Sequence, residues 1–111
     1  MAKILKKAQG MDGVLLLLDD RVVIDRPGIV NFFKYGKNAK REIPISAVSE
    51  VVFTPCSMFS IGQIEIVRSG SSNDEKRAQK NVNTMKFSKK NQRSFEVIKE
   101  KIFEMINQQR R

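Results

Sequence analysis

Residues 13–28 read Gly-Val-Leu-Leu-Leu-Leu-Asp-Asp-Arg-Val-Val-Ile-Asp-Arg-Pro-Gly, and this stretch decides the fold. It contains two short apolar runs, Val14–Leu18 and Val22–Ile24, joined at Asp19-Asp20. Successive side chains of an extended chain point to opposite faces, so the first run is apolar on both faces. A helix is the alternative, but the runs are short, the second is β-branched, and glycine and proline stand at the ends. We therefore predict a central β-hairpin whose first strand is covered on both faces.

Length and composition favour one small soluble domain spanning residues 1–111. The chain is 41% hydrophobic, which is enough for one core, and no apolar run reaches the roughly 18 residues of a membrane span. Residues 1–7 lack the apolar stretch of a signal peptide, and the single Cys56 cannot form an internal disulfide. We expect a cytoplasmic protein.

Most of the remaining chain also has the alternation of a β protein. A brief helical turn at 45–49, capped by Ser46, interrupts it, and residues 70–81 lack large apolar side chains and are predicted to form a mobile loop. The further strands are predicted at 4–9, 29–35, 40–44, 50–54, 60–68 and 82–87.

The C-terminal segment has the period of an amphipathic helix. At about 100° per residue, an apolar stripe forms, and charged residues fill most of the opposite face. The helix begins after Ser88 or Asn91 and runs to about Gln108. Its predicted buried stripe consists of Phe95, Ile98, Ile102, Met105 and Ile106.

The order of elements, strands first and one helix last, resembles that of bacterial pleckstrin-homology-like (PH-like) domains. The segments that carry the resemblance are 13–28, 42–48, 61–64 and 84–90. It implies a mainly β fold with one C-terminal helix: a curved antiparallel sheet or barrel of about seven strands, capped by the helix. Members often carry a further short C-terminal helical module, and none is expected in residues 1–111. Lipid-binding eukaryotic relatives have a basic run at the first turn, where this chain has residues 10–13, Gly-Met-Asp-Gly, so no specific inositol-phosphate pocket is expected.

Catalytic chemistry is poorly represented in the sequence. The chain has no histidine, one cysteine and no glycine-rich phosphate loop. Asp19-Asp20 can be interpreted as a carboxylate pair, but the position favours a turn. Cys56 can be a reactive thiol, but a free cysteine near strand ends is more often a small buried hydrophobe. We predict that the protein is not an enzyme and needs no metal or cofactor.

Two stretches are candidate binding sites. The net charge of +9 favours anionic partners, and a predicted turn gathers four cations around one aromatic ring. The alternative is that an exposed turn simply collects lysines. Met58 and Phe59 follow as a second candidate, either as an exposed anchor or as a lid folded back on the domain. The residues of the first stretch are Lys34, Tyr35, Lys37, Lys40 and Arg41.

The function that the sequence favours is a non-enzymatic protein-interaction module, its partner being unidentified. Peripheral binding to acidic membrane or to nucleic acid through the basic turn is the alternative, and a small inhibitor or regulator from a mobile element is another. The apolar runs of the central hairpin exceed what one helix can cover, so a homo-oligomer, most simply a dimer, is also predicted.

Overall fold

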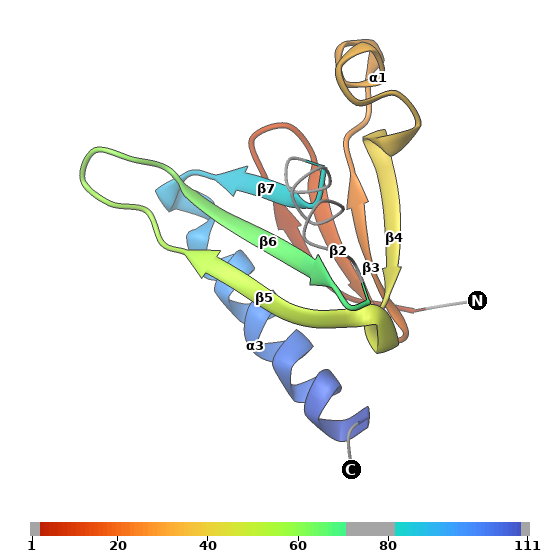
Figure 1. Ribbon diagram of the computed structural model, residues 1–111. Coiled ribbons are helices and arrows are strands. Elements are labelled where there is room, and N and C mark those ends of the chain that lie inside the picture. The colour runs from red at the N-terminus through yellow and green to blue at the C-terminus, as the bar shows by residue number, and fades with distance from the viewer. Residues whose placement is uncertain (1–2, 71–81, 110–111) are drawn as a thin grey trace.

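The computed structural model describes residues 3–70 and 82–109, and in them the fold is mainly β. Two antiparallel sheets hold seven strands, and a long C-terminal helix, α3 (Gln92–Gln109), lies against them (Figure 1). The first sheet has the order β1 (Ile4–Gln9), β2 (Val14–Leu18), β3 (Arg21–Asp25) and β4 (Lys40–Pro44); the second has the order β5 (Val48–Thr54), β6 (Gly62–Arg68) and β7 (Thr84–Phe87).

The predicted central hairpin is confirmed as β2 and β3. Leu15 pairs with Ile24 and Leu17 with Val22, and all four side chains lie in the core. The opposite face of β2 is only half-buried, so the expected second cover is incomplete. Asp19 and Asp20 lie at the turn.

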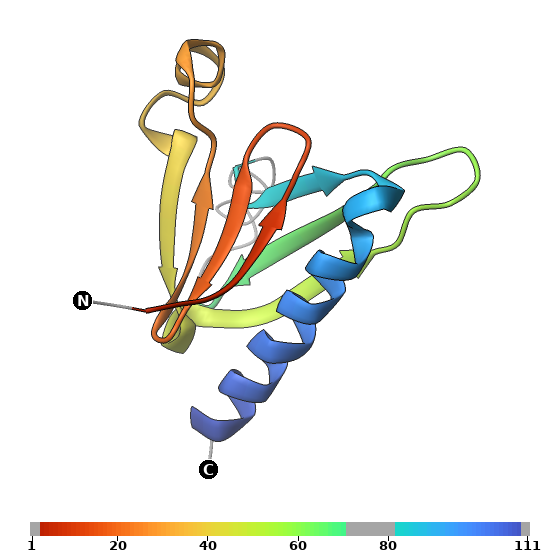
Figure 2. The same cartoon turned by 180° about the vertical axis from the view of Figure 1, so that it is seen from behind.

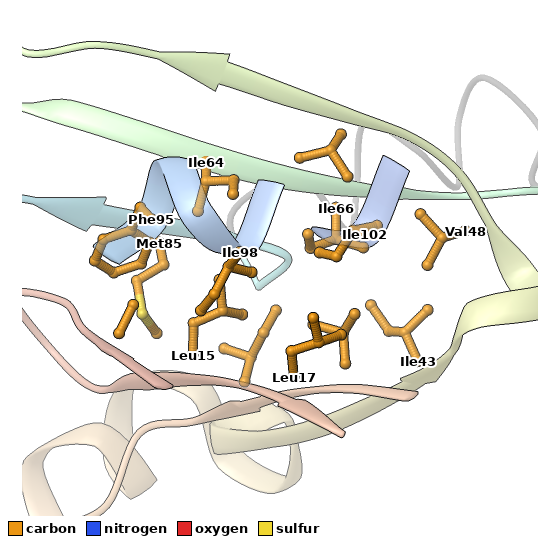
Figure 3. Close-up of a cluster of buried hydrophobic side chains, with 14 of the residues drawn as sticks. Leu15, Leu17, Ile43, Val48, Ile64, Ile66, Met85, Phe95, Ile98 and Ile102 are labelled. Carbon is orange, nitrogen blue, oxygen red and sulfur yellow. The ribbon is translucent and has the colours of Figure 1, made fainter. Parts of the chain in front are cut away.

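The core lies between the two sheets and α3 (Figure 2). Four of the five residues of the predicted helix stripe are buried, and Met105 packs against them half-buried. Figure 3 shows Phe95, Ile98 and Ile102 meeting the inward-facing residues of both sheets. The cluster includes Leu15, Leu17, Ile43, Val48, Ile64, Ile66, Met85, Phe95, Ile98 and Ile102.

The strand predicted at 29–35 is wrong: Ile29–Tyr35 form a short helix, α1. The β-branched and aromatic composition suits a strand, but a strand needs an edge, and the free edge of β3 is occupied by β4. Gly28 has φ 100°, which turns the chain away from the sheet, and its carbonyl accepts a hydrogen bond from the Phe32 amide. The backbone groups of this segment therefore form their hydrogen bonds within the helix instead of with a neighbouring strand.

The turns differ from expectation in smaller ways. The predicted turn at 36–38 is the 3₁₀ helix η1 (Gly36–Ala39), and η2 (Ile45–Ala47) begins after Pro44 with no side-chain cap, so the predicted Ser46 cap is wrong. The predicted mobile loop falls almost entirely at 71–81, outside the described residues. No helix in the described ranges is long and apolar enough to cross a membrane.

Candidate functional site

Helix α1 exposes its apolar side chains instead of burying them. Ile29, Val30, Phe32 and Phe33 are 71, 76, 61 and 80% exposed, and none of the seven residues of α1, all within the described part, is buried. Figure 1 shows the helix beyond the ends of β3 and β4, apart from both sheets. We call residues 29–40 the α1 projection. Large apolar side chains gathered in this way mark an interaction surface.

The α1 projection is held by a buried arginine at its base. Arg26 is 1% exposed, and its Nε donates to a carboxylate oxygen of Asp12 at 3.2 Å. Its two terminal nitrogens donate to the carbonyls of Val82 and Thr84, so one side chain joins β3, the β1–β2 turn and the start of β7. The ring of Tyr35 lies 4.4 Å from the guanidinium carbon.

Two further hydrogen bonds tie α1 to the same turn. The Tyr35 hydroxyl donates to the Asp12 carboxylate at 3.0 Å, and the Asn31 amide donates to the Asp12 carbonyl at 3.0 Å. Asn31 and Tyr35 thus face the domain, while the apolar residues of α1 face solvent. These hydrogen bonds fix the α1 projection to the rest of the fold.

The structure brings the basic residues of the predicted turn together only in part. The Lys34 ammonium lies 5.3 Å from the centre of the Tyr35 ring, and Lys37 and Lys40 are exposed on η1 and at the start of β4. Arg41 is half-buried and donates to the Asn38 side chain at 2.8 Å. Burial, and then the charges of Arg68 and Arg26, lower the pKa of Arg41 from its ordinary value.

The segment between β5 and β6 forms a second exposed apolar feature. Met58 and Phe59 are 89 and 94% exposed, so the hypothesis of a lid folded back on the domain is wrong. A tight turn closed by Ser57 and Ser60 carries them. We call residues 57–60 the β5–β6 tip.

A depression of about 970 Å³ lies between the α1 projection and the second sheet. Two cations, Lys34 and Lys86, stand on its opposite sides, and its surface mixes polar and apolar groups. Its lining is Met11, Asp12, Lys34, Tyr35, Asn38, Ile61, Gln63, Val82, Thr84 and Lys86.

The residues considered for catalysis, Asp20 and Cys56, make contacts within the fold. Arg21 donates two hydrogen bonds to Asp20, and these hold the pKa of that carboxyl below its ordinary value. The half-buried Cys56 packs against the core, and its sulfur accepts the Gly62 amide at 3.1 Å. In the ranges described, no group of three or more His, Cys, Asp or Glu residues lies close enough to hold a metal ion.

The chain was compared with protein-family models, curated proteins and solved structures. None of the three comparisons found a significant match. The residues themselves therefore carry the functional argument.

Sequence reasoning placed Met58, Phe59 and the basic turn among the candidates but missed the exposed apolar face of α1. The sequence does hold a signal for it: the apolar run at 29–33 leads directly into three lysines, and residues 26–41 contain no Asp or Glu. It also missed Arg26, whose partners lie 56 and 58 residues further along the chain.

Proposed function

We propose that this chain is a non-enzymatic binding module that docks on acidic membrane surfaces through the α1 projection. The observation that carries the proposal is the exposure of four large apolar side chains on one short, anchored helix. We further propose a PH-like barrel as its fold, which the order of four strands, three strands and a C-terminal helix supports.

The sequence alone favours a protein partner. The shape of the α1 projection favours a bilayer instead. The apolar residues project from the solvent-facing side of a short helix, and a fluid bilayer can receive such a side without a matching groove. Burial of a large apolar side chain is worth about 2 kcal/mol, so four of them supply an appreciable binding energy even when partly inserted.

The charges around the projection select an acidic surface. Five cations and no carboxylate lie in residues 26–41, and Lys34, Lys37 and Lys40 are exposed there. Each Lys or Arg near an anionic leaflet contributes about 1 kcal/mol. Apolar insertion and charge attraction therefore act on the same surface, at the cytoplasmic face of a membrane. The absence of histidine from the sequence and the packing of Cys56 support a role without catalysis.

Vesicle flotation tests the proposal. The full chain should float with vesicles that contain phosphatidylglycerol, float much less at high salt, and stay behind with pure phosphatidylcholine. The double variant Phe32→Ser/Phe33→Ser should weaken binding by about tenfold or more, because two inserted rings are lost. Phe103→Ser, which removes an exposed ring from α3, is the matched control and should bind as the wild type does.

Three results would contradict the proposal. The first is a wild-type chain that ignores anionic vesicles. The second is a Phe32→Ser/Phe33→Ser variant that is folded by circular dichroism and floats normally. The third is a chain that binds nucleic acid in a gel shift but no vesicle, which would favour the nucleic-acid alternative.

A further inference from the structure

We propose that the β5–β6 tip is a second membrane contact, so that the chain docks through two projections in one fixed orientation. The inference rests on the proposed function and adds a site, a geometry and a direction to it. The tip and α1 come from different sheets and share no residue.

The tip is closed by hydrogen bonds, although Met58 and Phe59 are the two most exposed large apolar residues in the described part of the chain. The Ser57 amide donates to the Ser60 carbonyl at 2.9 Å, and the two hydroxyls lie 2.6 Å apart. The Ser60 amide donates to the Ser57 hydroxyl at 3.1 Å. These bonds close the turn, so Met58 and Phe59 are held outward without contacts of their own to the core. A preorganised tip loses less conformational entropy when it inserts.

The base of the tip is bound to the first residue of α3. The Cys56 amide donates to the side chain of Gln92, at the start of α3, at 2.8 Å, and the Gly62 amide donates to the Cys56 sulfur. The tip therefore cannot swing freely on its strands. Insertion of the tip would constrain the orientation of the whole domain.

The charge distribution around the tip repeats that around α1. Residues 51–64 carry no charge, so nothing in the hairpin itself opposes entry into a bilayer. Beside the tip, a shallow hollow is lined by Met58, Phe59 and Lys89, and Lys90 is the next exposed cation. Residues 82–95 contain four cations and no carboxylate. An apolar tip with a purely basic flank is complementary to an acidic bilayer surface.

The two projections can contact one surface together. Figures 1 and 2 show α1 projecting at the top of the domain and the β5–β6 tip projecting to one side of its upper half, with the β1–β2 turn between them and the C-terminus of α3 at the opposite end. The depression between them is lined by Lys34 on the α1 side and by Ile61 and Lys86 on the other. A bilayer that receives both apolar ends meets Lys34 and Lys86 in the space between, together with the carboxylate of Asp12, which is paired with Arg26. The C-terminal end of α3 points away from this surface.

The chain lacks tryptophan, so single substitutions supply site-specific fluorescent reporters. Phe59→Trp reports on the β5–β6 tip, Phe33→Trp on α1, and Phe103→Trp on the exposed side of α3 as a control. With phosphatidylglycerol vesicles, emission at positions 33 and 59 should shift to the blue and be quenched by brominated acyl chains. Emission at position 103 should do neither.

A binding measurement complements the reporters. Met58→Ser/Phe59→Ser should lower vesicle affinity by about fivefold or more while α1 remains intact. Since both positions are fully surface-exposed, its circular dichroism and thermal midpoint should match the wild type.

The outcomes separate the two proposals. If position 33 reports insertion while position 59 stays in water and the Met58→Ser/Phe59→Ser variant binds normally, the second contact is overturned and the proposed function stands. If neither position responds and the wild type does not float, both fail. A position 59 that responds only to an added protein, and not to vesicles, also overturns the second contact and identifies the tip as a protein-docking element.

Discussion

The guanidinium carbon of Arg26 lies 4.4 Å from the centre of the Tyr35 ring, and through this contact α1, a helix with no buried residue, rests on a side chain that is 1% exposed. The Asp12 carboxylate accepts hydrogen bonds from both residues. Because Arg26 also binds the carbonyls of Thr84, in β7, and of Val82, two residues before it, the position of α1 is coupled to the contact between the sheets.

Loss of the Arg26 side chain should destabilise the whole domain. Arg26→Gln removes the charge facing Asp12 and the hydrogen bonds that Arg26 donates to the carbonyls of Val82 and Thr84. The free energy of unfolding should fall by about 3 kcal/mol, since a fully buried guanidinium loses its charge-assisted hydrogen bonds to two carbonyls. Arg21→Gln is the control, because Arg21 also binds two carboxylates but is exposed, and it should change stability by about 1 kcal/mol or less. Denaturant unfolding measures both, and equal effects would contradict the assigned role of Arg26.

The Tyr35 ring should fix α1 without being needed for the sheets. Tyr35→Leu removes the ring over Arg26 and the hydroxyl bound to Asp12. Amide protons of residues 31–35 should then exchange with solvent about tenfold faster or more, while those of β2 and β3 are unchanged. Tyr35→Phe keeps the ring and should give an intermediate rate. A uniform increase across the sheets would show instead that Tyr35 is part of the global fold.

The hairpin and α3 could be predicted because their signals are local. Two short apolar runs, with aspartates between them and glycine and proline at their ends, determine β2 and β3. The stripe from Phe95 to Ile106 determines the buried face of α3. The helix at 29–35 could not be predicted, because its composition suits a strand. A strand there would need the free edge of β3, which β4 occupies.

The candidate site was predictable in composition but not in arrangement. The basic turn and Met58-Phe59 stand out in the sequence by charge and by apolar character. Whether Phe59 folds back or projects depends on the turn closed by Ser57 and Ser60 and on the bond from Cys56 to Gln92, a partner 36 residues away. The anchor at Arg26 depends in the same way on distant carbonyls.

The stripe of α3 should carry the stability of the core. Ile102 is fully buried between the sheets and the helix, so Ile102→Asp places a carboxylate among apolar side chains and should unfold the domain at room temperature. Its neighbour Phe103 is 39% exposed, and Phe103→Asp should lower the thermal midpoint by a few degrees at most. Thermal unfolding of the two variants decides the point: comparable midpoints would mean that the helix is packed in a different phase.

Gly62 should tolerate no side chain, because β6 passes directly over an aromatic stack. The ring of Phe87 lies between those of Phe53 and Phe95, at centroid distances of 5.5 and 4.5 Å. A Cβ at position 62 would overlap the Phe87 ring and crowd the Thr54 carbonyl at 2.8 Å. Gly62→Ala should therefore lower the free energy of unfolding by about 2 kcal/mol, within the range found for overpacked cores.

Gly28→Ala is the control for backbone strain alone, since Gly28 has a positive φ and open space around it. Its free energy of unfolding should fall by about 1 kcal/mol. Chemical denaturation of both variants gives the comparison. The additional variant Phe87→Leu, placed on Gly62→Ala, should recover part of the loss by making room, and a double variant less stable than the sum of its single changes would rule out the overlap as the cause.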